Sequence, residues 1–103
     1  MAKLLTIEAF KATLSGPTPP DVPPPLRALW YDAKGDWDRA HQVAQDIDDA
    51  TGAWIHAYLH RKEGDLGNAA YWYERAGREV ATDPLQTEWE RIAESLIPRI
   101  PNP

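Results

Sequence analysis

Residues 34–40 read KGDWDRA and residues 63–69 read EGDLGNA, so the chain states one pattern twice, 29 residues apart. Each copy has Gly-Asp followed by an apolar residue and ends in Ala. A glycine supplies the left-handed backbone that ends one helix. The aspartate accepts hydrogen bonds from the free amides at the start of the next helix. The repeat therefore predicts two helix–turn–helix units, which stack because one helical hairpin cannot bury its faces alone.

Helical periodicity extends to both sides of the two copies. Thr6 and Asp83 are expected N-caps, and Pro84 is expected at the first position of the last helix. No segment alternates between apolar and polar residues for long enough to form a strand. We predict a single all-α domain over residues 1–103. Its expected parts are a helix at 6–14, a proline-rich connector at 16–25, hairpins at 26–48 and 51–77, and a capping helix at 83–97 that Pro98 ends.

The connector holds six of the ten prolines, in the sequence GPTPPDVPPP. Proline fixes φ and pushes the preceding residue toward extended geometry, so we expect an extended strap that packs on the hairpins. A ligand for a proline-binding module is the alternative. We favour the strap, because Arg27 is the one basic residue near enough to anchor such a ligand.

Composition narrows the function classes. The net charge of −5 argues against general nucleic-acid binding, which relies on a Lys/Arg surface. The chain has no cysteine, which excludes disulfides and thiolate chemistry and fits a reducing compartment. The first ten residues have neither the charge pattern of a signal peptide nor the length of a membrane span. We therefore expect a cytoplasmic protein without membrane or nucleic-acid partners.

The second hairpin resembles a tetratricopeptide-type helical repeat, and WYERAG at 72–77 looks like the Sel-like variant of that family. The residues that agree are Ala57, Gly64, Ala69, Tyr73 and Ala76. The first hairpin agrees more weakly, at Ala28, Tyr31, Gly35 and Ala40, because Pro24 and Pro25 shorten its first helix. The resemblance spans residues 26–84. WYDAKGDW and HAYLHRKEGD also look similar to small bacterial proteins, a likeness that implies no activity.

The resemblance implies a scaffold that contacts other proteins. In that family the first helix of a hairpin lines a groove that receives peptides, and the matching residues here are Trp54, Tyr58, Arg61 and Lys62. Aromatic rings beside a guanidinium are good anchors for a peptide or a carboxylate. The alternative is that other helices cover Trp54 and Tyr58, since a small core needs every large aromatic side chain.

The three histidines form the second candidate site. His56 and His60 lie at i and i+4 on one helix face, a spacing at which two imidazoles share a divalent metal, and His41 on the neighbouring helix adds a third ligand in that alternative. The aspartates at 46, 48 and 49 are further possible ligands, although DIDDATG lacks the length and the distal Glu of a calcium loop. We favour packing and hydrogen bonding for these histidines, because a pair of them makes a weak motif.

These observations predict a non-catalytic protein–protein interaction or scaffold module without a cofactor. The partner is a protein or peptide whose identity the sequence leaves open, as it does the oligomeric state. No phosphate-binding loop, nucleophile motif or paired-carboxylate motif indicates an enzyme. The alternative is a small metal-binding protein or metal-dependent enzyme that uses His41, His56 and His60.

Overall fold

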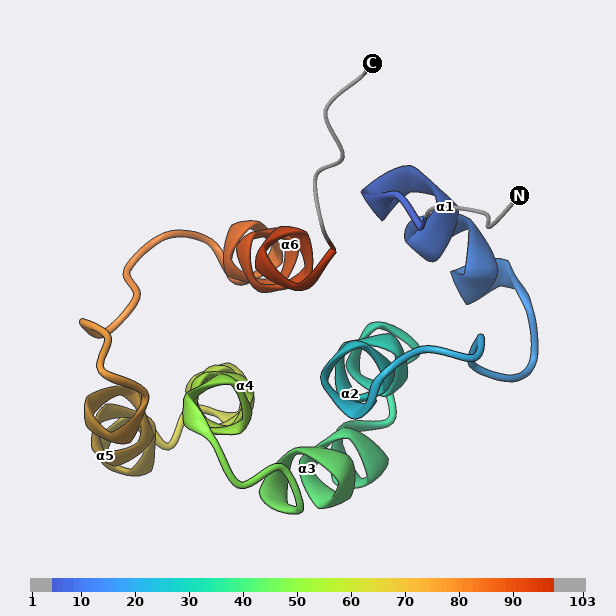
Figure 1. Cartoon of the computed structure of the whole chain (residues 1–103). Coiled ribbons are helices and arrows are strands. Elements are labelled where there is room, and N and C mark those ends of the chain that lie inside the picture. The colour runs from blue at the N-terminus through green and yellow to red at the C-terminus, as the bar shows by residue number, and fades with distance from the viewer. Residues whose placement is uncertain (1–4, 98–103) are drawn as a thin grey trace.

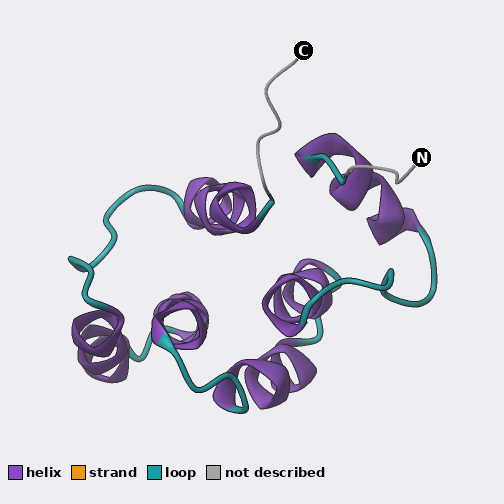
Figure 2. Cartoon of the chain, viewed as in Figure 1, coloured by secondary structure: helices purple, strands orange, loops and turns teal. Residues whose placement is uncertain are grey.

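The computed structural model describes residues 5–97 and confirms an all-α fold (Figures 1 and 2). Over that range the chain forms six α-helices and one short 3-10 helix, and no strand. The elements are α1 (Ile7–Ala12), η1 (Thr13–Ser15), α2 (Pro24–Ala33), α3 (Trp37–Gln45), α4 (Ala50–Glu63), α5 (Leu66–Ala76) and α6 (Leu85–Leu96). Among these described helices, none is long and apolar enough to cross a membrane.

The two copies of the Gly-Asp pattern do what their chemistry predicts. Gly35 and Gly64 adopt φ of +84° and +89°, in the left-handed region that favours glycine. The Asp36 and Asp65 carboxylates then accept hydrogen bonds from backbone amides three residues later, at the starts of α3 and α5. Each pattern thus ends one helix and begins the next, and α2 packs on α3 as α4 packs on α5.

Two helix starts differ from the predicted ones. Helix α4 begins at Ala50, one residue before the predicted hairpin, because the Asp49 carboxylate accepts a hydrogen bond from the Gly52 amide and caps the helix. Helix α2 begins at Pro24, since proline needs no hydrogen-bond partner in a first turn and its φ already suits a helix. The prolines therefore open this helix, and the extended connector ends at Pro23.

The start of α6 corrects the prediction for Asp83. Pro84 is the N-cap residue and makes no side-chain cap, and Leu85 is the first helical residue. The Asp83 carboxylate pairs instead with Arg91, one oxygen lying 2.9 Å from a guanidinium nitrogen. A carboxylate two residues ahead of the helix reaches an arginine on its second turn more readily than the first amides. Pro98, predicted to end α6, lies outside the described residues.

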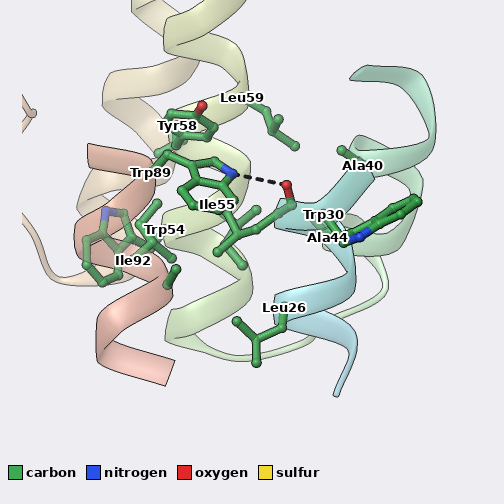
Figure 3. Close-up of a cluster of buried hydrophobic side chains, with 14 of the residues drawn as sticks. Leu26, Trp30, Ala40, Ala44, Trp54, Ile55, Tyr58, Leu59, Trp89 and Ile92 are labelled. Atoms are coloured by element: carbon green, nitrogen blue, oxygen red, sulfur yellow. Dashed lines mark hydrogen bonds between the residues drawn. The ribbon is translucent and has the colours of Figure 1, made fainter. Parts of the chain in front are cut away.

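Helix α4 forms the centre of the molecule. Its residues 52–60 are all buried, and it contacts α2, α3, α5 and α6 (Figure 1). A helix that is buried all round is typical of the core of a helical bundle. Trp89 of α6 closes the other side, where its indole nitrogen donates to the Leu29 carbonyl at 3.0 Å (Figure 3). Phe10 of α1 stacks on Trp89, so the N-terminal helix packs against α6.

Candidate metal centre

The packing of α3 against α4 brings all three histidines together. His41 lies on α3, and His56 and His60 lie one turn apart on the face of α4 that meets it. The helices approach closely because Ala40 and Ala57 are both fully buried and present only a methyl group. One ring nitrogen from each histidine lies within 4.8 Å of the others. The third imidazole, which the sequence offered as an alternative, is therefore in reach of the first two.

The closest pair is His41 and His56, whose Nε2 atoms lie 2.8 Å apart. At that distance one nitrogen carries the proton and the other accepts it. Stacking holds both rings in place: the His41 ring lies on Trp37 at 4.9 Å between centroids, and the His56 ring lies on Trp72 at 4.0 Å. Trp37 is itself fixed, because its indole nitrogen donates to the Leu59 carbonyl at 2.8 Å.

His60 is oriented by a carboxylate. Its Nδ1 lies 2.6 Å from Glu63 Oε1, and its Nε2 lies 3.3 Å from Asn68 Nδ2. A carboxylate beside Nδ1 favours a proton there, which leaves the Nε2 lone pair available as an acceptor or a metal ligand. This is the outer-shell arrangement that metal-binding histidines commonly have. Glu63 and Asn68 were not identified from the sequence as parts of the site, although Glu63 stands at i+3 from His60.

The surroundings keep two of the imidazoles neutral. Burial, followed by repulsion from His41 and His60, lowers the pKa of His56 to about 4. Burial, followed by repulsion from His60, also lowers the pKa of His41, while Glu63 and Asp38 oppose that change. Neutral imidazole is the form that coordinates a metal. At neutral pH these two imidazoles are therefore uncharged, which is the state that coordination requires.

The spacing is close to what a metal requires. Zinc–nitrogen bonds of 2.0–2.1 Å in a tetrahedron place ligand nitrogens about 3.3–3.4 Å apart. The His41–His56 contact would have to open by about 0.5 Å, and the widest separation would have to close by at most about 1.4 Å. Changes of that size need only small rotations of the rings, which makes the cluster a fit for a single ion.

A second group overlaps the first at His60. Ligand atoms of His60, Glu63 and Asp65 also lie within 4.8 Å of one another. Both carboxylates have other tasks, since Glu63 orients His60 and Asp65 caps α5 through the Asn68 amide. Asp46 and Asp48, considered as ligands from the sequence, belong to neither group, and Asp49 caps α4. The triple-histidine cluster is therefore the stronger metal candidate.

The four residues predicted to line a peptide groove lie on α4 away from the histidines, and other helices cover the two aromatic ones. Trp54 is 4% exposed and Tyr58 is 2% exposed. The Trp54 indole donates to Glu88, and the Tyr58 hydroxyl donates to Asp32 at 2.7 Å. Burial, and then the Asp32 charge and hydrogen bond, raise the pKa of Tyr58 far above its ordinary value, so its phenol stays protonated.

The two predicted basic residues are also engaged. Arg61 pairs with Glu88 at 2.9 Å and also donates to the Asp83 carbonyl. Lys62 lies 2.8 Å from a carboxylate oxygen of Asp32 and is partly open to solvent. The predicted residues are therefore brought together on one face, where they join α4 to α2 and α6.

Comparison with known proteins adds no assignment. No family model, no curated protein and no solved structure matches the chain.

Proposed function

We propose that this protein binds one divalent transition-metal ion through His41, His56 and His60. The observation that carries the proposal is the convergence of three imidazoles from two helices, with one nitrogen of each within 4.8 Å of the others. The carboxylate of Glu63 on the far nitrogen of His60 supports it, since such partners orient the imidazole and raise its basicity.

The donor set selects the class of metal. Imidazole nitrogens suit zinc, copper, nickel and cobalt, whereas magnesium and calcium prefer oxygen ligands. The chain has no cysteine, so thiolate ligands do not contribute to the selection. Among divalent ions of the first row, copper is expected to bind more tightly than nickel or zinc, according to the general order of affinities for such ligands.

Isothermal titration of the untagged, metal-free protein with zinc chloride tests the proposal. We expect one ion per chain. Replacement of each histidine by glutamine should weaken binding by about 100-fold or more, since even outer-shell changes typically cost 10–100-fold. Glu63→Gln, an outer-shell change, should weaken zinc binding by about 10–100-fold. Asp65→Asn is the matched control, because it removes a carboxylate near His60 that the proposed centre does not use.

Two outcomes would overturn this function. One is the absence of stoichiometric binding by the native protein. The other is unchanged affinity in His41→Gln together with a large loss in Asp65→Asn, which would place the ion at the group of His60, Glu63 and Asp65. Circular dichroism of each variant separates loss of a ligand from loss of the fold.

Binding of a protein or peptide partner, the function expected from the sequence, is our second proposal. A pocket of about 490 Å³ supports it, with Trp54, Arg78, Arg91 and the rest of segment 77–83 in its lining. The Arg78 guanidinium lies 3.4 Å from the centre of the Trp54 ring. A guanidinium over an indole suits a peptide carboxylate, and Arg91 beside it is already paired with Asp83. Titration of the native protein with hexaglutamate should show saturable binding, and Arg78→Gln should weaken it. Equal affinity of the native protein and Arg78→Gln for hexaglutamate would exclude this pocket as the binding site.

A further inference from the structure

We infer that the metal centre takes a small monovalent anion from solution as its fourth ligand, and that Asn68 selects for it, an inference that rests on the metal binding proposed above. Three protein ligands with a fourth position open is the pattern of zinc sites that exchange ligands, whereas structural zinc sites have four protein ligands. The composition of the triad and the position of Asn68 together indicate a site with an open fourth position.

The described residues offer no further histidine or carboxylate ligand to the triad. The group that holds His41 and His56 contains His60 as its third member and no carboxylate. Glu63 lies against Nδ1 of His60 and so leaves Nε2 as the nitrogen free to bind the ion. Its task is to orient the imidazole. The remaining position of a tetrahedral ion is then left to a ligand from solution.

Access to that position is available on the side of α3. His41 is only half-buried, in contrast to His56 and His60, which are each 7% exposed. A small ligand can therefore approach past His41 without displacement of a helix. The stacked rings of Trp37 and Trp72 flank the cluster and limit the size of what enters. The geometry favours an ion of a few atoms over an extended substrate.

Asn68 supplies the selectivity. Its Nδ2 lies 3.3 Å from Nε2 of His60, the nitrogen that a metal would occupy. Once the metal takes that lone pair, the Asn68 amide loses its acceptor. A half-buried N–H group without an acceptor is costly, and a fourth ligand that accepts a hydrogen bond removes that cost. The first turn of α5, which carries Asn68, is held in place because the backbone nitrogen of Asn68 donates to Asp65 at 3.3 Å.

Charge favours a monovalent anion. Neutral histidines leave the charge of a divalent ion in the site, and Glu63, in contact with His60, offsets part of it. A negatively charged fourth ligand brings the centre closer to neutrality, which stabilises a partly buried ion. A carboxylate group or a small inorganic anion meets both requirements, since each carries one charge and accepts hydrogen bonds.

Cobalt(II) in place of zinc makes the fourth ligand visible, because its absorption bands depend on the ligand set. The cobalt-loaded native protein should be titrated with sodium azide at constant ionic strength. We expect a saturable spectral change. Asn68→Ala should weaken azide binding about 5-fold, the equivalent of one hydrogen bond, while cobalt affinity changes by less than about 2-fold. Gln86→Ala, which removes an amide from α6, is the control and should match the native protein.

The outcomes separate this inference from the function on which it rests. Failure of cobalt to bind would overturn both. Stoichiometric cobalt whose spectrum does not respond to azide would overturn this inference alone. If the spectrum of Asp38→Asn then did respond to azide, the Asp38 carboxylate would be the fourth ligand. Equal azide affinity in Asn68→Ala and the native protein would exclude the role of Asn68.

Discussion

The carboxylate of Glu88 lies 2.9 Å from the guanidinium of Arg61, and the Glu88 side chain has no exposed surface. The same carboxylate accepts hydrogen bonds from the Tyr73 hydroxyl at 2.6 Å and from the Trp54 indole at 3.2 Å. Burial, followed by the bond to Glu88, raises the pKa of Tyr73, so the phenol remains a donor. One buried charge on α6 thus joins side chains of α4 and α5.

Glu88→Gln should therefore destabilise the fold strongly. The substitution keeps the shape of the side chain but leaves Arg61 without its charge partner, and breaking a buried pair costs about 3–5 kcal/mol. We expect about 2–4 kcal/mol here, because Arg61 retains some contact with water. Urea titration measures the change. Glu90→Gln, on the exposed side of α6, is the control and should leave the urea midpoint close to that of the native protein. Similar losses in both variants would show that burial of the charge is unimportant.

Gly64 should be sensitive to any side chain. Its φ of +89° is strained for other residues, although a Cβ there would meet no atom within 4 Å. Gly64→Ala should destabilise by about 1 kcal/mol. Gly67→Ala makes the same chemical change at an exposed helical position with equally open space, and should be neutral or stabilise by up to about 1 kcal/mol. Equal effects of the two substitutions in urea titration would contradict the left-handed cap.

The all-α fold and most of its helix boundaries could be predicted from the sequence, because Gly-Asp turns and Asp caps act locally. The site could not be predicted to the same depth. The spacing of His56 and His60 is visible in the sequence, but the approach of His41 depends on how α3 packs on α4. The burial of Trp54 depends in the same way on α6. The tetratricopeptide-like arrangement and the cytoplasmic location stay predictions.

Gly52 shows a close contact that the sequence conceals. It lies in the first turn of α4, where a Cβ would be 2.1 Å from the Ile47 carbonyl oxygen. The segment between α3 and α4 folds back over this position, so only glycine fits. Gly52→Ala should destabilise by about 2–3 kcal/mol, because the backbone would have to shift. Thermal unfolding measures the loss, with Ala50→Gly as a comparison for helix propensity alone. A change below about 1 kcal/mol would mean that the segment moves easily.

The stability of the metal-free protein should fall in mild acid. The pKa of His56 is about 4 in the folded chain and about 6.5, its ordinary value, in the unfolded chain. Between these two pH values the unfolded chain binds a proton that the folded chain does not. The stabilisation is complete above pH 6.5 and is lost as the pH falls toward 4. His56→Gln should flatten this part of the profile. Urea midpoints measured at intervals of half a pH unit in the presence of a chelator provide the measurement. A midpoint that stays constant from pH 7 to pH 4.5 would contradict a neutral, buried His56.

The connector before α2 should resist proteolysis in the native state. The Lys34 ammonium donates to the carbonyls of Leu14 and Gly16, at 2.8 Å and 3.0 Å, and Val22 packs against the core. Ordered backbone is a poor substrate for a broad protease, so cleavage by proteinase K should require local opening.

Lys34→Met removes both of these hydrogen bonds and keeps the apolar stem. If one of them contributes about 1 kcal/mol, opening becomes about 5-fold more frequent and cleavage within residues 14–22 should accelerate by that factor. Lys11→Met is the control, because Lys11 pairs with Glu90 on α6 and makes no bond to the connector. Mass spectrometry locates the cuts, and urea titration confirms that both variants stay folded under the digestion conditions. Rapid cleavage of the native protein at these residues would show that the connector is a free linker.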